Sequence, residues 1–307
     1  MRGASGGVVL VVNLSPAWQR TLFFSKFQPG EVNRVRRVVE SASGKGVNVA
    51  RVLNTLRIPV RLLTVAGGHR GELFRRALAK EGISARIVPV RSETRFCQTL
   101  VASTATELVE EAAPLSRREL RAWLATFHGE LAGAKWLVLT GTVPQGCGEE
   151  FYARLTRTAR RQGVPVLLDA QRAQLMKAVR ERPSLVKINR SELLAAAGKG
   201  GVAELLAAGA QCVVITRGAK SVDVYEGKAR WRMHPPRVRA VNPVGSGDAM
   251  LAGICYGLCR GWSVREAVRM GMACGAANAL TETAGVVRLR DLRRLFGEIL
   301  DKSRNAL

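Results

Sequence analysis

The chain alternates between short runs of apolar, mostly β-branched residues and longer segments in which apolar positions recur every three to four residues. Runs of the first kind indicate buried strands, and the longer spacing indicates amphipathic helices. The predicted strands are residues 8–12, 60–65, 136–139, 164–168, 185–188 and 212–216. The predicted helices between them are residues 47–56, 73–80, 117–131, 149–162 and 202–208. Strands that are apolar throughout and separated by helices predict an α/β fold whose mostly parallel sheet is buried on both faces.

Other parts of the chain depart from this alternation. Three helices are predicted in succession after Ala240, over residues 247–260, 263–279 and 289–300. Residues 20–41 and 94–110 alternate in polarity like half-exposed strands, and both lie between core elements. We expect these two segments to form a small separate sheet that acts as a lid over one end of the large sheet. The sequence contains no linker, repeat or low-complexity tract, so a single domain with a lid is predicted over residues 1–307.

Composition narrows the classes of protein that the chain can belong to. Of its 307 residues 47% are hydrophobic, enough for a sizeable core, which excludes global disorder. The six cysteines contain no CxxC pair and the three histidines no HExxH spacing, so we expect buried reduced thiols rather than disulfides or a metal site. No stretch of about eighteen apolar residues occurs, and residues 8–12 are too short for the apolar core of a signal peptide. A cytoplasmic protein without a membrane segment is therefore expected.

The sequence carries 48 Lys and Arg against 24 Asp and Glu, a formal net charge of +24. Such an excess favours an anionic partner, which could be nucleic acid, a membrane surface or a phosphorylated small molecule. The basic residues are scattered, however, and their longest uninterrupted runs are pairs such as Arg36-Arg37 and Arg293-Arg294. This pattern is typical of a general surface bias, with phosphate ligands as a local use of it. Nucleic acid is not expected as a partner.

A glycine-rich motif at residues 43–50, Ser-Gly-Lys-Gly-Val-Asn-Val-Ala, follows an extended segment and begins a predicted helix. Gly44 and Gly46 allow the backbone to approach a ligand closely, and the start of the helix offers free N–H groups. Asn48 presents an amide to the same place. The motif matches neither the GxxxxGK[ST] nor the GxGxxG spacing. A glycine-rich helix start that binds no ligand is the alternative interpretation.

A second motif occupies residues 242–253, Asn-Pro-Val-Gly-Ser-Gly-Asp-Ala-Met-Leu-Ala-Gly. Gly245 and Gly247 allow a tight turn whose N–H groups converge at a helix N-terminus and stabilise negative charge, including that of a transferring phosphoryl group. Asp248 lies beside this turn, where a carboxylate can accept a proton from an alcohol. An Asp that merely caps the helix is, on spacing alone, an equally good interpretation.

In this order the two motifs resemble those of the phosphofructokinase-B branch of the ribokinase-like sugar kinases. Further matches extend the resemblance over nearly the whole chain, at residues 29–34, 94–95, 140–146, 186–192, 215–219, Asn278 and Gly285. The similarity is greatest to 1-phosphofructokinase, tagatose-6-phosphate kinase and the minor 6-phosphofructokinase. The resemblance implies a ribokinase-like three-layer α/β/α fold with a central mostly parallel sheet and a small β lid. It also implies an ATP-dependent carbohydrate kinase that uses Mg²⁺.

The same resemblance implies roles for residues at the acceptor end of the site. Asp248 would be the general base toward the acceptor hydroxyl, and the backbone of Gly245, Ser246 and Gly247 would form the anion hole. The residues that would bind the acceptor are Gln19, Gly44, Lys45, Gly46, Asn48 and Arg95. Arg95 suits the phosphate already on the sugar, because a guanidinium donates two parallel hydrogen bonds to phosphate oxygens. A solvated surface charge is the alternative for Arg95.

At the nucleotide end, the resemblance implies ATP contacts from residues in the second half of the chain. These residues are Lys187, Asn189, Thr216, Arg217, Gly218, Gly247 and Asn278. Glu192 would organise Mg²⁺ indirectly, through water. Asn189 followed by Glu192 is also a natural helix start, and that role does not exclude contact with the nucleotide. A homodimer formed through the β lid is expected as well.

The sequence departs from the family pattern at the end of the first strand. Residues 15–19 read Ser-Pro-Ala-Trp-Gln where the family usually has Asn-Pro-Ala-x-Asp, so Gln19 places a neutral amide where a carboxylate hydrogen-bonds sugar hydroxyls. The lid segment 99–112 is also shorter than usual, and Ser221 replaces a second glycine. The predicted reaction is phosphoryl transfer to a hydroxymethyl group of fructose 1-phosphate, tagatose 6-phosphate or fructose 6-phosphate.

Two other functions stay open. One is a kinase for an unphosphorylated sugar or a nucleoside, which Arg34 and Arg95 disfavour because phosphate is the natural ligand of a guanidinium. The other is a non-catalytic sugar- or nucleic-acid-binding descendant of the fold, which the retained Asp248, Lys187 and Glu192 disfavour.

Overall fold

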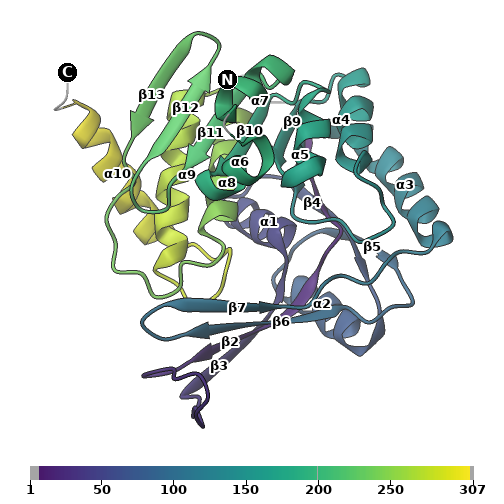
Figure 1. The fold of residues 1–307 in the computed structure, drawn as a ribbon, viewed down its shortest axis with the longest axis vertical. Coiled ribbons are helices and arrows are strands. Elements are labelled where there is room, and N and C mark those ends of the chain that lie inside the picture. The colour runs from purple at the N-terminus through teal and green to yellow at the C-terminus, as the bar shows by residue number, and fades with distance from the viewer. Residues whose placement is uncertain (1–6, 199, 305–307) are drawn as a thin grey trace.

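The computed structural model describes residues 7–198 and 200–304 of the predicted domain, and a nine-stranded sheet forms its centre (Figure 1). From one edge to the other, the strands are β13 (Ala229–Met233), β12 (Val222–Glu226), β11 (Cys212–Thr216), β10 (Leu185–Asn189), β9 (Val166–Asp169), β8 (Ala134–Thr140), β1 (Val8–Asn13), β4 (Val60–Ala66) and β5 (Ala85–Pro89). The strands from β11 to β5 pair in parallel, and β12 and β13 are antiparallel. The predicted α/β fold with a mostly parallel sheet is confirmed.

Helices cover both faces of this sheet, which gives three layers (Figure 1). One face packs against α1 (Lys45–Thr55), α2 (Gly68–Lys80), α8 (Ser246–Cys259), α9 (Val264–Ala279) and α10 (Leu289–Arg304). The other packs against α3 (Arg117–Leu131), α4 (Phe151–Arg161), α5 (Arg172–Val179), α6 (Arg190–Ala197) and α7 (Gly201–Ala208). Val9 and Val11 belong to the first apolar cluster, whereas Leu10 and Val12 belong to the second. Because successive side chains of a strand point to opposite faces, a strand buried on both faces must be apolar throughout.

A second sheet of four strands, here called the small sheet, stands apart from the large one at the bottom of Figure 1. Its order is β3 (Arg37–Ser43), β2 (Ala17–Phe23), β6 (Arg95–Val101) and β7 (Ala105–Val109). The central pair β2–β6 is parallel, and the outer pairs are antiparallel. The chain passes from β1 into β2 within three residues and from β3 directly into α1. Both connections tie the small sheet to elements of the large one.

The pattern of apolar residues does not predict five of these elements, although Asn189 and Glu192 mark the start of one of them, α6. Like α7, which the pattern does predict, α5 and α6 have only eight residues each, about two turns, so few repeats of their apolar positions are available to recognise them. Strand β5 lies at a sheet edge, and β12 and β13 form an antiparallel hairpin beyond the parallel strands, so none of the three is a continuous apolar run. In the part of the chain that the structure describes, no helix combines the length and the apolar character needed to cross a membrane.

Helices α8 and α9 approach closely because glycines lie where they cross. A Cβ atom on Gly253 would lie 2.8 Å from the Cα of Gly271 and 2.8 Å from the Sγ of Cys274. A Cβ atom on Gly271 would lie 2.7 Å from the backbone oxygen of Met250. Neither position has room for a side chain unless the two backbones move apart. This contact fixes α8, whose first turn carries Asp248.

The substitution Gly253→Ala should therefore lower the free energy of unfolding by about 1–3 kcal/mol, the usual cost of forcing an extra methyl group into a packed core. Gly297→Ala in α10 is the matched control, because no atom lies within 4 Å of the added Cβ and alanine favours a helix over glycine by up to ~1 kcal/mol. Urea unfolding of the two variants and the parent measures the difference. A Gly253→Ala protein as stable as the parent would show that the helix pair separates at no cost.

Candidate active site

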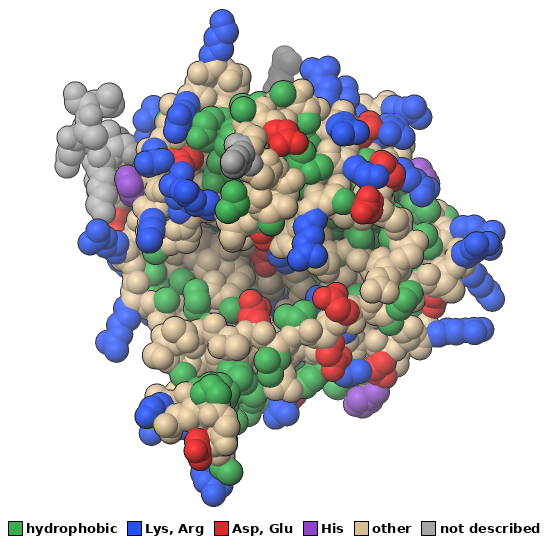
Figure 2. Space-filling view, viewed as in Figure 1, with side chains coloured by type: hydrophobic (Ala, Val, Ile, Leu, Met, Phe, Trp, Pro, Cys, Tyr) green, Lys and Arg blue, Asp and Glu red, His purple; other side chains and the backbone are tan. Residues whose placement is uncertain are grey.

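A cavity of about 1380 Å³ opens between the large sheet and the small sheet, and Figure 2 shows it as the hollow at the centre of the face. Asn13, Asn189 and Thr216, which end three of the parallel strands, line one side. Gln19 and Thr99 of the small sheet line the other. Ligands of parallel α/β sheets bind at the carboxyl ends of the strands, so the cavity lies where the fold provides a site.

The cavity brings together most of the residues that the sequence predicts for the site. Those that line it are Gln19, Gly44, Lys45, Asn48, Arg95, Lys187, Asn189, Glu192, Thr216, Arg217, Gly218, Gly245, Ser246, Gly247 and Asp248. Gly46 and Asn278 are not among the lining residues. The backbone N–H of Gly46 donates to Oδ1 of Asn13, which places Gly46 behind the wall of the cavity.

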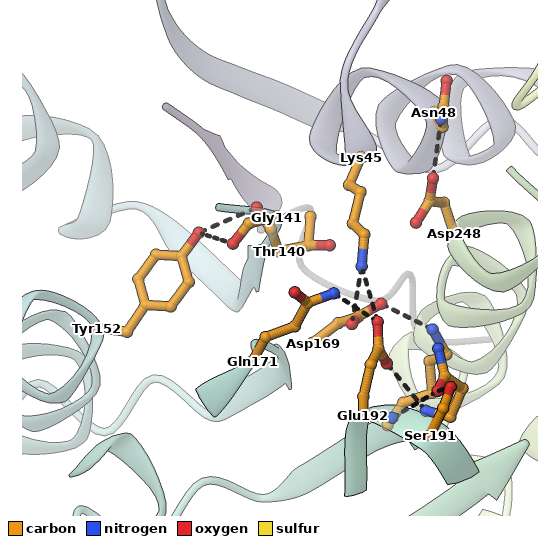
Figure 3. A network of polar contacts seen from close by, with 12 residues as sticks. Lys45, Asn48, Thr140, Gly141, Tyr152, Asp169, Gln171, Ser191, Glu192 and Asp248 are labelled. Carbon is orange, nitrogen blue, oxygen red and sulfur yellow. Dashed lines mark hydrogen bonds and ion pairs between the residues drawn. The ribbon is translucent and has the colours of Figure 1, made fainter. Parts of the chain in front are cut away.

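The two glycine motifs meet at Asp248. Although 200 residues separate them in the sequence, Nδ2 of Asn48 donates to Oδ2 of Asp248 at 2.8 Å (Figure 3). Asp248 is 6% exposed, and this burial raises its pKa to about 6, opposed mainly by the attraction of the Lys45 ammonium. A carboxyl with this pKa is ionised at neutral pH and is more basic than an ordinary Asp. Both properties suit a general base.

The turn at residues 244–247 presents its backbone to the cavity and is held from behind. Gly245 has a φ of 81°, a left-handed conformation that glycine adopts without strain, and it precedes the first residue of α8. Nδ2 of Asn278 donates to the backbone oxygen of Val244 at 2.9 Å and to Oγ of Ser246 at 3.1 Å, while its Oδ1 accepts from the N–H of Gly285. Asn278 thus supports the turn, and its contact with a nucleotide stays a prediction.

Asp169 lies fully buried beneath the cavity and binds two ammonium groups (Figure 3). Nζ of Lys187 lies 2.7 Å from its Oδ2, and Nζ of Lys45 lies 3.5 Å from its Oδ1. Burial alone would raise the pKa of Asp169, but the attraction of Lys187 and Lys45 outweighs it, so the pKa is lowered. The same attraction raises the pKa of Lys45. Lys45 is therefore charged at neutral pH.

The ammonium group of Lys187 also lies beside the glycine turn. A Cβ atom on Gly247 would lie 3.0 Å from Nζ of Lys187, so the ammonium group lies directly against the Gly247 backbone. The turn's N–H groups, the N-terminus of α8 and the ammonium group together favour an anion at this point. This arrangement can stabilise the charge of a transferring phosphoryl group.

Glu192 and Asn189 form the start of α6 as the sequence predicts. Oδ1 of Asn189 accepts from the N–H of Glu192 at 2.8 Å, and Oε2 of Glu192 accepts from the N–H of Asn189 at 3.0 Å. The other carboxylate oxygen of Glu192 accepts from Nε2 of Gln171 and lies 3.7 Å from Nζ of Lys45 (Figure 3). Glu192 therefore lines the cavity in a fixed orientation.

The acceptor end of the cavity holds the two residues whose roles the sequence leaves most open. Nε2 of Gln19 donates to Oγ1 of Thr99 at 3.0 Å, so the amide is oriented by the neighbouring strand. The guanidinium of Arg95 donates to three backbone oxygens, those of Ser15, Pro16 and Glu110. Three of its five N–H groups thus bind the backbone just before β2 and just after β7. The binding of a substrate phosphate by Arg95 stays a prediction.

At the opposite end of the cavity, Arg217 follows the last residue of β11. Its Nη2 lies 2.9 Å from Oδ2 of Asp223, which also pairs with Arg232. These two arginines lower the pKa of Asp223. The ion pair fixes the Arg217 side chain beside Thr216 and Gly218, where the sequence predicts that the nucleotide passes.

Sequence reasoning misses Asp169 and Gln171. Asp169 is a single carboxylate that ends the apolar run of β9, and a lone charge at the carboxyl end of a parallel strand is a signal of a site. The apolar run predicts a strand that ends at residue 168, one residue before this carboxylate. Gln171 has no comparable signal, because only the fold places its amide beside Glu192.

Comparisons with known proteins show the family and the fold of the chain. A family model described as pfkB family carbohydrate kinase matches residues 17–288. The chain is similar to phosphofructokinase-2 from Escherichia coli in complex with substrates and products, with 25% identity and a TM-score of 0.88 over 96% of this chain and 99% of that one. The tetrameric inhibited form of the same enzyme matches with 24% identity, a TM-score of 0.85 and the same coverage. A 1-phosphofructokinase candidate from Thermotoga maritima matches with 24% identity and a TM-score of 0.85 over 94% of this chain and 97% of that one.

Replacing Asp248 by Asn should make the stability of the protein less dependent on pH. The pKa of about 6 in the folded state lies above the value of 3.8 for a free Asp, so folding favours the protonated carboxyl. The parent protein therefore loses stability as the pH rises from about 4 through 6, by about 3 kcal/mol in total. Asn carries no charge and avoids this loss. Urea unfolding should show a gain for Asp248→Asn that is larger at pH 7.5 than at pH 4.5, and an equal gain at both would contradict the pKa shift.

Proposed function

The chain belongs to the pfkB family of carbohydrate kinases, and on that basis we propose that it transfers the terminal phosphoryl group of ATP to a hydroxymethyl group of a sugar phosphate. The observation that carries the proposal is the position of Asp248, a buried carboxylate with a pKa of about 6 beside the anion-binding turn. Fructose 1-phosphate, tagatose 6-phosphate and fructose 6-phosphate are the proposed acceptors. The similarity to a phosphofructokinase over 96% of the chain supports this choice.

In the proposed reaction, Asp248 accepts the proton of the acceptor hydroxyl as its oxygen attacks the phosphorus atom. The N–H groups of residues 245–247 stabilise the negative charge on the transferring group, and Lys187 adds a positive charge behind them. Asn48 donates to Asp248 and so holds the carboxylate in the orientation that receives the proton. Lys45 adds a second ammonium group between Asp248 and Asp169.

We propose ATP and Mg²⁺ as the further requirements of the reaction. In the described residues no cluster of three or more acidic, His or Cys side chains could hold a metal by itself. Mg²⁺ usually binds phosphate oxygens and waters with few protein ligands, so Glu192 at the cavity wall fits a contact through water. The ion would neutralise phosphate charge. Lys187, Asn189, Thr216, Arg217 and Gly218 line the part of the cavity proposed for ATP.

A kinase for an unphosphorylated sugar or a nucleoside is the second candidate, and two observations favour it. Arg95 already donates to three backbone oxygens, which leaves it less free to bind a substrate phosphate. Gln19 places an amide in the wall where an uncharged hydroxyl can either donate or accept. The two candidates share the reaction and differ only in the acceptor.

We propose a cytoplasmic homodimer that forms through the small sheet. Val38 and Leu108 share the face of this sheet opposite Gln19, and they are 41% and 51% exposed. Exposed apolar residues on one sheet face are typical of an interface. The tetrameric form of the Escherichia coli enzyme shows that a similar chain assembles. Lys and Arg side chains are spread over the face in Figure 2 rather than gathered in one patch, so nucleic acid is not proposed as a partner.

The substitution Asp248→Asn removes the base while keeping the shape of the side chain, so turnover should fall by about 10²-fold or more with ATP binding little changed. The measurement is ADP release with a panel of sugar phosphates, free sugars and nucleosides, beside ATP binding by calorimetry. Turnover within about threefold of the parent would show that Asp248 only caps the helix.

The substitution Arg95→Ala distinguishes the two acceptor classes. If Arg95 binds the phosphate of the sugar, the KM for a sugar phosphate should rise about tenfold or more, because a hydrogen bond to a charged group contributes about 1.5–3 kcal/mol. The KM for the corresponding free sugar should stay the same. Equal losses with both acceptors would mean that Arg95 only joins the backbone of the small sheet.

A further inference from the structure

Arg51 is a buried arginine on α1 that sequence analysis does not assign to the site. The residue is 6% exposed, and a buried guanidinium is stable only when its N–H groups and its charge are both satisfied. Its partners come from four segments of the chain: the carboxylate of Glu81, the backbone oxygens of Ala42 and Ala284, and Oδ1 of Asn48. Glu81 neutralises the charge, and two of the remaining partners, Asn48 and Ala284, line the cavity.

The contact with Asn48 decides which end of that amide faces Asp248. Nη1 of Arg51 lies 3.4 Å from Oδ1 of Asn48, and Nδ2 of Asn48 lies 2.8 Å from Asp248. A guanidinium has donors only, so it holds the amide oxygen toward itself and the NH₂ toward the carboxylate. A free amide could turn over whenever Asp248 is protonated and accept its proton, which would stabilise the neutral carboxyl. Arg51 excludes that arrangement.

The contact with Ala284 fixes the loop that lies behind the anion-binding turn. A Cβ atom on Gly245 would lie 2.7 Å from Cβ of Ala284 and 3.1 Å from the backbone nitrogen of Gly285. A Cβ atom on Gly285 would lie 2.6 Å from Cα of Asn48. The loop therefore packs tightly between the turn and α1. Nη1 of Arg51 donates to the backbone oxygen of Ala284 at 2.8 Å and holds the loop in this position.

The third contact reaches the small sheet. Nη2 of Arg51 donates at 2.8 Å to the backbone oxygen of Ala42, the second-last residue of β3. Ala42 is paired with Trp18, which precedes Gln19 on β2. The side chain of Arg51 thus connects three parts of the site. They are the small sheet that would bind the acceptor, Asn48 beside Asp248, and the Ala284 loop behind the glycine turn.

We propose that Arg51 is a positioning residue of the kinase reaction. It keeps the Asn48 amide oriented toward Asp248 and the Ala284 loop against the Gly245 turn, and it touches neither substrate. The inference rests on the proposed function, because Asp248 and the turn have their roles only in that reaction. A residue that served the fold alone would need no link to Asn48, since the ion pair with Glu81 already neutralises it.

The test follows the titration of Asp248 itself. The chain contains only five aspartates, so ¹³C NMR of Asp-labelled protein resolves their carboxyl carbons, with Asp248→Asn as the assignment standard. Arg51→Lys keeps the charge beside Glu81 but lacks the planar fork that reaches all four partners. The midpoint of Asp248 should rise by about half to one pH unit. Lys45, Lys187 and Asp169, the charged groups that face Asp248 from α1, β10 and β9, remain in place in this variant.

The pH dependence of kcat/KM should reflect the same rise in the Asp248 midpoint. With the midpoint raised, kcat/KM of Arg51→Lys at pH 6 should fall about two- to fivefold more than at pH 8.5, because fewer Asp248 side chains are ionised at pH 6. At pH 8.5 Asp248 is ionised in both proteins, and a remaining loss of kcat of about threefold or more reports the displaced turn. Glu81→Gln is the matched control. It removes the ion pair and lowers stability, and it should leave the Asp248 midpoint and the pH profile unchanged.

The outcomes separate the two proposals. An unmoved Asp248 midpoint in a folded Arg51→Lys protein, or an equal shift in Glu81→Gln, overturns the inference and leaves Arg51 as a fold anchor. A parent protein that phosphorylates no acceptor of the panel overturns the proposed function instead, and the NMR result does not depend on it. If Arg51→Lys does not fold, neutron diffraction from a crystal of the parent protein grown at pH 5 shows the orientation of the Asn48 amide. The ND₂ group of Asn48 facing Asp248 supports the inference, and the amide oxygen facing it overturns the inference.

Discussion

A fully buried carboxylate, Asp169, is the charge around which the rest of the site is arranged. An isolated ion at this depth would cost many kilocalories per mole, so the fold has to bring it partners. Lys187 reaches it from β10 and Lys45 from α1. The need to neutralise one carboxylate therefore places two ammonium groups where the glycine turn, the helix N-terminus and the strand ends meet, and removal of either lysine would leave the buried charge uncompensated.

Asp248 is also buried, but its surroundings raise its pKa, whereas those of Asp169 lower it. Among the described residues Asp248 receives one side-chain hydrogen bond, from Asn48, and forms no ion pair, so burial raises its pKa to about 6, while Asp169 stays firmly ionised. Two carboxylates in one site whose pKa values are driven apart by their neighbours are a recurrent means of assigning one to chemistry and one to structure. The division follows from where the lysines lie.

The sequence predicts the parts of this molecule that local patterns determine. The apolar runs and the 3.6-residue spacing predict the central strands and the longer helices, and the two glycine motifs predict which residues meet at Asp248. Asp169 escapes prediction because its role depends on lysines 124 and 18 residues away in the chain. Arg51 escapes because an arginine within a helix is usually solvated, and only the fold reveals its four partners. Arg95 shows the limit of a single residue's chemistry, because three backbone oxygens compete for its N–H groups.

The place of β1 in the large sheet has a consequence for how the protein is made. β1 is the first strand along the described residues and lies inside the sheet, with β4 on one side and β8 on the other. On the ribosome, β4 follows soon after β1, but the other edge of β1 has no partner until residues 134–140 emerge. An apolar strand with an open edge can pair with other chains, so a nascent chain is exposed to aggregation until β8 has emerged. After β8 each new strand adds to the outer edge in order, and the hazard therefore ends well before the last helices are translated.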